Sequence, residues 1–240
     1  MKALIFAAGL GTRLRPLTND RPKALVEING QSLLEINIRK LVDLGFDEIV
    51  VNVHHFADKM IAFLEELEVD ATIHISDERE EVLETGGGLQ KAADFLQGEE
   101  SFLVHNVDIL TDLDVMSMMK EHEKLDALAT LAIQKRTSSR YLLFDETDTL
   151  HGWTNVRDGI VRQKRPTEQD LFFWGFSGVQ VISPRIFDLF TRKGKFSIID
   201  TYLDCAKQNI IKGFPHEALW MDVGKPENLE KAKMIFNPLS

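Results

Sequence analysis

The fold class of this chain is indicated by one run near its start, Ala3-Leu4-Ile5-Phe6-Ala7-Ala8-Gly9-Leu10-Gly11. Its first part, residues 3–7, is apolar throughout, which is typical of a strand covered by helices on both faces. Glycine directly after such a strand lets the backbone approach a ligand closely, and exposed amide hydrogens there can hold phosphate oxygens. The stretch therefore predicts an α/β fold with an anion site where the first strand ends.

Similar apolar runs alternate with helical patterns in the first half of the chain. The sequence predicts strands at 48–53, 72–76 and 102–107 and helices at 57–67, 88–96, 113–124, 197–208 and 227–236. Another helix is expected after Ser32, because Ser32 and Glu35 have the spacing of a capping box and Gly45 stands at the C-terminal cap position. Alternating strands and helices of this kind indicate a mainly parallel central sheet.

The order of the expected elements changes after about residue 125, where strands follow one another with few helices between them. They are expected at 127–134, 140–144, 159–163 and 172–182, which favours antiparallel additions to the sheet. No Gly/Ser-rich linker divides the 240 residues, so we expect one domain over 1–240. No hexapeptide repeat follows the last helix, and no C-terminal β-helix domain is expected.

Charge and composition exclude several classes of protein. The net charge is −10, from 28 basic and 38 acidic residues, which argues against nucleic acid as a partner. The single cysteine cannot form an internal disulfide, and the apolar run at the start is too short for a signal peptide. No apolar stretch of about 18 residues is present, so no membrane span is expected. We predict a soluble, cytoplasmic protein.

Cations surround the first glycines of this acidic chain. Arg13, Arg15, Arg21 and Lys23 lie within a few residues of them, and such a local field draws a triphosphate. The loop matches neither the dinucleotide fingerprint, which needs a third glycine where Leu14 stands, nor the P-loop. The alternative interpretation is a glycine-rich turn with solvated charges.

Five motifs together resemble one known family. The first has two parts, Gly9-Leu10-Gly11-Thr12-Arg13-Leu14-Arg15-Pro16-Leu17-Thr18 followed by Pro22-Lys23-Ala24-Leu25, and resembles the signature of the sugar-1-phosphate nucleotidyltransferases. The later ones follow in the family's order: Glu84-Thr85-Gly86-Gly87-Gly88, Asn106-Val107-Asp108, Phe176-Ser177-Gly178 and Trp220-Met221-Asp222-Val223-Gly224. The resemblance covers most of the chain and implies a Rossmann-like, three-layer α/β fold with a mixed, mostly parallel sheet.

The resemblance also implies an activity and roles for residues. Members join a nucleoside triphosphate to a sugar 1-phosphate and release pyrophosphate, and these two substrates are the expected partners. Nucleotide binding is implied for Ala8, Gly9, Gly11, Thr12, Arg13, Lys23, Glu84, Thr85, Gly86, Gly87 and Asn106. Catalysis is implied for Arg13, Lys23 and Asp108, and Mg²⁺ binding for Asp108 and Asp222. Contacts to the sugar phosphate are implied for Lys164 or Arg165, with Trp174 and Ser177 beside them.

Within the family, the compact length and the Glu-Thr-Gly-Gly-Gly and Phe-Ser-Gly motifs are most similar to two groups. These are the N-acetylmuramate 1-phosphate uridylyltransferases and the short mannose-1-phosphate guanylyltransferase-like members. The similarity favours UTP as the donor, with GTP next. A monomer or a homodimer is expected.

The residues themselves support the two metal ligands. Asp108 stands at the carboxyl end of an apolar strand, where open α/β sheets bind their ligands, although a helix cap is the alternative. Asp222 lies in an apolar run on the same face as Trp220, and a carboxylate there needs a partner or a metal. Three glycines at 86–88 leave open space in which a flat base could lie against backbone.

One difference from the family's motifs and two alternative functions remain open at this point. Val107 stands where the family usually has glycine, and its branched side chain would fill space beside Asp108. A non-catalytic nucleotide sensor would explain that departure. A metal-dependent glycosyltransferase would use Asp112 and Asp114, although two acids at the start of a predicted helix are commonly caps.

Overall fold

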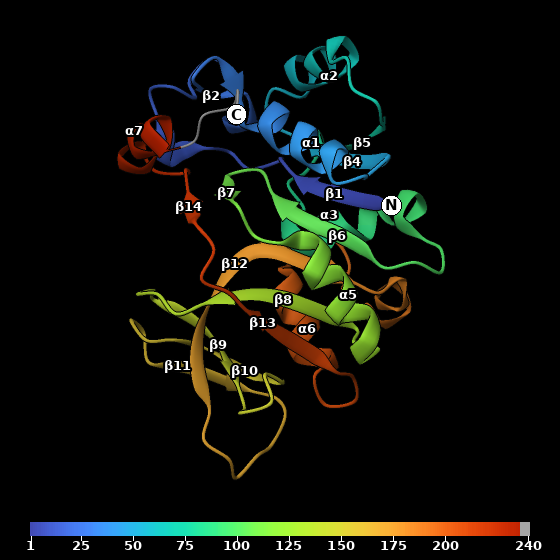
Figure 1. The fold of residues 1–240 in the computed structure, drawn as a ribbon, viewed down its shortest axis with the longest axis vertical. Coiled ribbons are helices and arrows are strands. Elements are labelled where there is room, and N and C mark those ends of the chain that lie inside the picture. The colour runs from blue at the N-terminus through green and yellow to red at the C-terminus, as the bar shows by residue number, and fades with distance from the viewer. Residues whose placement is uncertain (236–240) are drawn as a thin grey trace.

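A ten-stranded mixed sheet forms the centre of the computed structural model, which describes residues 1–235 (Figure 1). One part is parallel and runs in the order β6 (Phe102–Asn106), β1 (Lys2–Phe6), β4 (Glu48–Val53), β5 (Thr72–Asp77). Beyond β6 the order continues with β12 (Phe172–Ile182), β9 (Arg140–Phe144), β10 (Leu150–Asn155) and β11 (Ile160–Gln163), each antiparallel to its neighbours. The long strand β12 also pairs with β8 (Ala129–Gln134), which carries β13 (Ile211–Pro215) in parallel. The expected antiparallel additions after residue 125 are confirmed.

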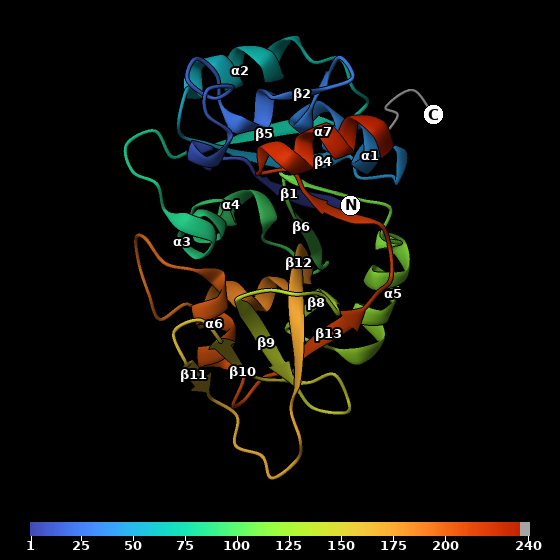
Figure 2. The ribbon, with the colours of Figure 1, turned by 90° about the vertical axis from the view of Figure 1, so that its left-hand side faces the viewer.

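Helices cover both faces of the sheet and complete the three-layer fold. Ala3 and Ile5 belong to the core cluster formed with α1 (Leu33–Asp43), α2 (Ala57–Glu66), α5 (Val115–Leu125) and α7 (Pro226–Ile235). Leu4 and Phe6 belong to the cluster formed with α3 (Glu84–Lys91), α4 (Ala93–Leu96) and α6 (Ile198–Cys205). Figure 2 shows α3, α4 and α6 on one side of the sheet and α5 on the other. Because side chains alternate along a strand, an all-apolar strand such as β1 is buried on both faces.

The first long helix begins and ends as its sequence predicts. The backbone amide of Glu35 donates to the Ser32 hydroxyl at 3.1 Å, and the helix ends at Asp43. Gly45 follows with a φ of +89°, a left-handed conformation that glycine adopts without steric cost.

Several elements differ from the prediction. The helix expected to begin at residue 88 begins at Glu84, so the three glycines lie inside α3 and not in a loop. Residue 236, the last of the expected C-terminal helix, lies outside the described residues. The sequence pattern missed β10, β13, two short two-stranded ladders and three 3-10 turns. These are β2 (Glu27–Ile28) with β3 (Gln31–Ser32), β7 (Ile109–Thr111) with β14 (Trp220–Asp222), and turns at Thr12–Leu14, Lys23–Leu25 and Pro184–Leu189.

The pairing of β7 with β14 positions the site. Asp222 lies opposite Ile109 in this antiparallel pair, and the amide of Val223 donates to the carbonyl oxygen of Asp108 at 2.9 Å. Two segments far apart in sequence thereby lie side by side. Over the described part of the chain, none of the helices has the length and apolar character needed to cross a bilayer.

Candidate functional site

The loop after β1 is held against β4. The side-chain oxygen of Asn52 accepts hydrogen bonds from the amides of Ala7 and Ala8, at 2.5 and 3.1 Å. Gly11 has a φ of +64°, and a Cβ atom there would lie 2.9 Å from Cβ of Lys23, so the loop requires glycine at this position. The two 3-10 turns that follow carry Arg13 and Lys23.

Two carboxylates and two cations converge beside this loop. The Lys23 ammonium donates to Oδ2 of Asp108 at 2.6 Å, and both side chains are largely buried. A Cβ atom on Gly224 would lie 2.8 Å from Oδ1 of Asp222, 2.9 Å from Nη2 of Arg13 and 3.0 Å from Oδ2 of Asp108. Both aspartates and Arg13 therefore surround one point, which only a glycine leaves open.

Two cavities meet at these residues. One of about 1080 Å³ lies between the two halves of the sheet, and one of about 360 Å³ lies beside the glycine loop. Asn106 and Asp108 line both, so the two spaces adjoin at the end of β6. An arrangement of this kind can bring two different ligands together at Asp108.

The smaller cavity has a buried carboxyl group in its wall. Glu78 accepts from the side-chain amide of Asn52 at 2.7 Å and from the backbone amide of Leu83 at 3.3 Å. Burial raises the pKa of Glu78. Polar groups fixed in this way fix the orientation of a bound ligand.

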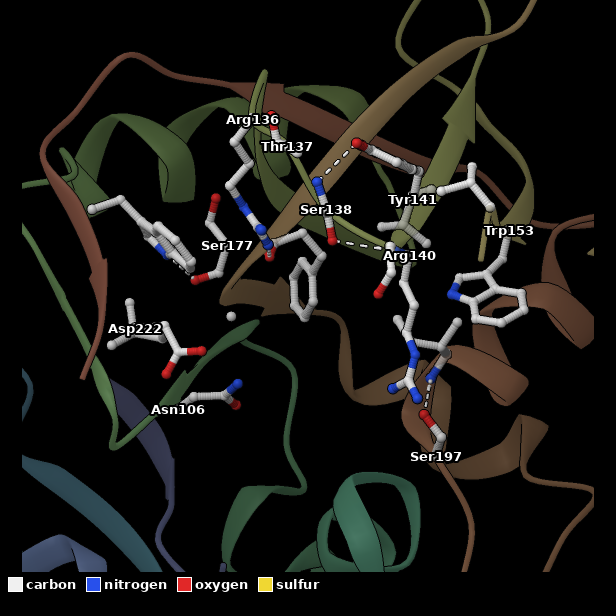
Figure 3. Close-up of a pocket in the computed structure, with 18 of the residues that line it drawn as sticks. Asn106, Arg136, Thr137, Ser138, Arg140, Tyr141, Trp153, Ser177, Ser197 and Asp222 are labelled. Atoms are coloured by element: carbon white, nitrogen blue, oxygen red, sulfur yellow. Dashed lines mark hydrogen bonds between the residues drawn. The ribbon is translucent and has the colours of Figure 1, made fainter. Parts of the chain in front are cut away.

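The larger cavity is rich in cations although the chain is acidic (Figure 3). Its walls include six basic side chains, Arg13, Arg136, Arg140, Arg157, Arg162 and Lys225, and three acidic ones, Asp108, Asp200 and Asp222. An excess of positive charge in a cleft raises the local concentration of anionic ligands.

Arg136 is held in this cavity in an unusual way. Its guanidinium lies 4.4 Å from the ring centroid of Trp220 and donates to the carbonyl of Phe176 at 2.8 Å. Nε is buried without a hydrogen-bond partner, no carboxylate lies within ion-pair distance in the described structure, and burial lowers the pKa of Arg136. A Cβ atom at Gly175 would lie 2.7 Å from this Nε, so the glycine makes room for the arginine. Arg136 is half-buried, and Asp222 acts on its charge from beyond ion-pair distance. A partly desolvated cation without a direct carboxylate partner is costly for stability, which indicates a functional role.

Ser177 is fixed on the wall of the same cavity. Its hydroxyl lies 2.8 Å from Nε2 of His216, and its carbonyl accepts from the indole of Trp220 at 2.8 Å. Burial lowers the pKa of His216, so the neutral imidazole is favoured.

The structure brings most of the predicted site residues together. Ala8, Gly9, Lys23, Glu84, Thr85 and Asn106 line the smaller cavity, Arg13, Ser177 and Asp222 line the larger one, and Asp108 lines both. Gly11 and Thr12 line neither and act within the loop, where Gly11 gives close packing against Lys23.

The expected open space at the three glycines is wrong. A Cβ atom at Gly86 would lie 2.4 Å from the ring of Phe196, and one at Gly87 would lie 2.0 Å from the carbonyl oxygen of Gly194. These glycines are buried and let α3 pack closely against the segment before α6. Gly86 and Gly87 line neither cavity, so the structure does not place them beside a bound base.

The residues expected to contact the sugar phosphate lie elsewhere, apart from Ser177. Lys164 and Arg165 follow β11, where their backbone amides donate to the carbonyl of His151 at 2.9 and 3.2 Å. Trp174 lies under the ammonium of Lys135 at 5.3 Å. None of the three lines either cavity. The cations of the larger cavity, Arg136 among them, were missed, although basic residues clustered around Arg136 and Arg140 in an acidic chain could have indicated them.

Val107 packs away from the site. Its side chain is 1% exposed within the core cluster, and its backbone bonds to β1 and to the Asn37 side chain. The residue is therefore accommodated by the core and does not fill the space beside Asp108.

The acidic pair Asp112 and Asp114 does not form a second site. Asp114 caps α5, because its carboxylate accepts from the amide and the hydroxyl of Ser117 at 2.9 and 2.6 Å. Neither aspartate lines a cavity described above. The cap interpretation is confirmed for Asp114.

Comparison with known proteins agrees with this geometry. Residues 2–142 match the model of the family described as nucleotidyl transferase. The chain belongs to the nucleotidyl transferase family. An N-acetylmuramate alpha-1-phosphate uridylyltransferase of Caulobacter vibrioides is 38% identical over 235 residues, covering 94% of this chain and 92% of that protein. A mannose-1-phosphate guanyltransferase of Yarrowia lipolytica is 29% identical, and the match covers 98% of this chain but 64% of that protein.

Solved structures of other proteins share the fold. HddC from Yersinia pseudotuberculosis in complex with GMP-PN has a TM-score of 0.78 at 25% identity and covers 98% of this chain. A UDP-glucose pyrophosphorylase in complex with UDP-glucose has a TM-score of 0.78 at 17% identity, which shows the fold alone. The predicted Rossmann-like nucleotidyltransferase fold is confirmed, as is the prediction that the chain is an enzyme of the nucleotidyltransferase class.

Proposed function

We propose that this nucleotidyltransferase joins a nucleoside triphosphate to a sugar 1-phosphate and releases pyrophosphate. The observation that carries the proposal is the junction of two cavities at Asp108 and Asn106, with Lys23 and Arg13 beside it. The smaller cavity fits the nucleoside and the larger one the sugar phosphate. Their reacting phosphates would meet at the junction.

The reaction needs little from the protein in the way of proton transfer. A sugar phosphate oxygen attacks the α-phosphorus of the triphosphate, a new P–O bond forms, and the bond to the β-phosphate oxygen breaks. The second pKa of a phosphate monoester is about 6, so the attacking oxygen is anionic near neutral pH. Catalysis then consists of aligning two polyanions and stabilising charge on the departing pyrophosphate.

Lys23 and Arg13 are placed for that work. The ammonium of Lys23 lies beside Gly9, because a Cβ atom on that glycine would be 3.6 Å away from Nζ. Arg13 is 57% exposed and lies 3.8 Å from Asp222, so its guanidinium is free to turn toward a triphosphate. Both cations would bind phosphate oxygens from opposite sides of the junction.

Asp108 and Asp222 fit a magnesium ion. No group of three or more His, Cys, Asp or Glu side chains within residues 1–235 could hold a metal. Mg²⁺ does not require one, because it is commonly bound by one or two carboxylates together with substrate phosphates and water. When bound, the ion would supply Lewis-acid stabilisation of phosphate charge. The two aspartates would hold it, while Lys23 fixes the orientation of Asp108.

UTP is the favoured donor in this proposal, with GTP next. The two relatives whose names specify uridylyl transfer cover more than nine tenths of both chains, whereas the guanyltransferases match over 64% or less of their length. Glu78 or Glu84, on the wall of the smaller cavity, would accept a hydrogen bond from the single N–H group of uracil.

Arg136 replaces Lys164 and Arg165 as the proposed ligand of the sugar phosphate. It lacks a carboxylate partner in the described structure and lines the larger cavity together with Asp222. An anion in this cavity would relieve the cost of its burial. Ser177 would donate its hydroxyl hydrogen to the same ligand.

The test is pyrophosphate release from purified protein with each nucleoside triphosphate and a panel of sugar 1-phosphates, in the presence of Mg²⁺. We expect release with UTP and at least one sugar 1-phosphate. Binding of a nucleoside triphosphate without release under any pairing would reject the proposal and support a nucleotide sensor.

A further inference from the structure

Ser177 and His216 form a pair on the wall of the larger cavity. Ser177 lies on β12 and is 1% exposed, and its Oγ lies 2.8 Å from Nε2 of His216, which directly follows β13. A hydroxyl group has one hydrogen to donate and two lone pairs that accept. The position of the hydrogen between Ser177 and His216 therefore decides whether Ser177 can donate to a ligand.

The backbone around Ser177 is fixed by two other residues of the cavity. The carbonyl of Phe176 accepts from Arg136, and that of Ser177 accepts from the indole of Trp220, both at 2.8 Å. Figure 3 shows Ser177 next to Arg136 and Asp222 at one end of the cavity. The hydroxyl of Ser177 is therefore held at the end where the sugar phosphate is proposed to bind.

The imidazole of His216 carries a single ring hydrogen. Burial lowers the pKa of His216, although Asp112 acts in the opposite direction, so the ring is neutral near neutral pH. A neutral imidazole has one nitrogen that donates and one that accepts. The hydrogen lies either on Nε2, which then donates to Ser177, or on Nδ1, in which case Nε2 accepts the hydrogen of Ser177.

The surroundings of Nδ1 favour the hydrogen on Nε2. Nδ1 of His216 is buried and has no hydrogen-bond partner among residues 1–235. A hydrogen on Nδ1 would leave a buried donor without an acceptor, and orphaned N–H groups are rarer in native structures than acceptors with an unused lone pair. With the hydrogen on Nε2, Ser177 accepts from His216 and keeps its own hydrogen.

A second pair of histidine and serine shows a contact that serves the fold alone. Nε2 of His122 lies 3.0 Å from Oγ of Ser101, and Nδ1 lies 2.9 Å from Oγ1 of Thr130. His122 is buried, and none of these three residues lines either cavity. Both ring nitrogens of His122 are used within the fold, whereas His216 directs one nitrogen at a residue of the cavity.

We propose that His216 is a positioning residue for the sugar 1-phosphate: its Nε2–H donates to Ser177, and the hydroxyl hydrogen of Ser177 is thereby directed at the phosphate. The proposal rests on the proposed function and adds a residue that lines neither cavity. The attacking phosphate oxygens are anionic near neutral pH and can only accept hydrogen bonds. A hydroxyl whose oxygen already has a donor meets them with its hydrogen and needs no reorientation.

The tautomer of His216 can be measured without turnover. In protein labelled with nitrogen-15 histidine, long-range proton–nitrogen correlation spectra distinguish the Nε2–H from the Nδ1–H tautomer. The variant His216→Gln identifies the signal of this residue among the seven histidines of the chain. We expect the Nε2–H tautomer near neutral pH, and the Nδ1–H tautomer would overturn the proposal.

Kinetics test the effect on the acceptor, with UTP and the 1-phosphates of glucose, mannose, N-acetylglucosamine and N-acetylmuramate. His216→Met removes the donor without adding charge and keeps a side chain of similar size. It should raise KM for the acceptor about threefold to tenfold, the range for one hydrogen bond, and leave KM for UTP unchanged. His216→Gln, whose side-chain amide can donate in place of Nε2–H, should stay within about twofold of the wild type. An unchanged KM for the acceptor in His216→Met would overturn the proposal.

A double-variant cycle separates positioning from packing. In a Ser177→Ala background, His216→Met should cause no further rise in KM for the acceptor, because no hydroxyl is left to direct. An equal rise in both backgrounds would overturn the proposal. His122→Met is the matched control, since it breaks the other histidine–serine pair. It should lower the melting temperature and leave KM for the acceptor unchanged, and a rise as large as that in His216→Met would count against a specific role.

The outcomes separate this proposal from the proposed function. Pyrophosphate release with none of the four acceptors, at any nucleoside triphosphate, would reject both. Release by the wild type together with the Nδ1–H tautomer, or with unchanged kinetics in His216→Met, would reject the positioning role alone.

Discussion

Replacing Gly224 by alanine should slow the enzyme without unfolding it. The added Cβ atom would lie 2.8–3.0 Å from charged atoms of Asp222, Arg13 and Asp108, whereas an ordinary contact is 3.4 Å or longer. Each of the three groups must therefore move by about 0.4–0.6 Å. All three contacts are to the ends of side chains and not to backbone, so the movement costs little folding free energy.

The same movement is costly for catalysis. A displacement of about 1 Å at a reacting centre can lower the rate about a hundredfold. Three displaced groups in Gly224→Ala should lower kcat for pyrophosphate release by about tenfold to a hundredfold. The melting temperature should stay within a few degrees of the wild type.

Gly98→Ala provides the matched control. Gly98 has open space around it but a φ of +147°, which strains any residue with a Cβ atom. This variant should lose stability and keep its kcat. Stopped or coupled pyrophosphate assays and thermal melts on both proteins decide the matter: near-normal kcat in Gly224→Ala at saturating Mg²⁺ would refute the convergence of the three groups.

Three further predictions concern the metal ligands, the core and the response to acid. Asp108→Asn and Asp222→Asn should each lower kcat by at least about a hundredfold in folded protein, and a chelator should abolish wild-type turnover; unimpaired variants would contradict the magnesium site. Val107→Gly should lower the free energy of unfolding by about 1–3 kcal/mol in urea melts, since it removes a buried side chain, and a gain in turnover would instead show that Val107 obstructs the site. Burial lowers the pKa of His105 and of His122 from 6.5 to about 4, so the unfolded chain takes up protons first as pH falls. The free energy of unfolding should therefore fall between pH 6.5 and 4 by about 2–3 kcal/mol per histidine, and His122→Gln should flatten this slope; equal slopes in both proteins would count against it.

The parts of the fold that the sequence predicted are those set by local patterns. The apolar strand at residues 3–7, the capping box at Ser32 and the left-handed Gly45 each depend on neighbours only a few residues away. Lys23 and Asp108 were predicted from motifs, and the structure brings them within 2.6 Å. Motifs of this kind can be recognised from residues close together in sequence. The carboxyl ends of parallel strands lie at one edge of the sheet, which brings separate motifs together there.

Long-range pairing decided what the sequence could not predict. Three successive glycines look like open space in a sequence, but whether they are open depends on what packs against them, here Phe196 and Gly194. Lys164 and Arg165 were placed at the site because they stand at the family's position, yet the end of β11 turns their backbone amides toward His151. A one-residue difference in where a strand ends sends a side chain to the other face.

Arg136 shows why the proposed acceptor side of the site is harder to predict than the proposed nucleotide side. The nucleotide loop is continuous in sequence, so its glycines and cations form a pattern that can be recognised. The environment of Arg136 is formed by Gly175 and Phe176 of β12 and by Trp220 of β14, which leave it space, accept its hydrogen bond and stack on it. Each of these residues has an ordinary structural explanation in isolation. Only their assembly leaves a guanidinium half-buried, stacked on Trp220 and without a carboxylate at ion-pair distance in the described structure. That combination, which no local pattern encodes, is the observation on which the proposed binding of an anion by Arg136 rests.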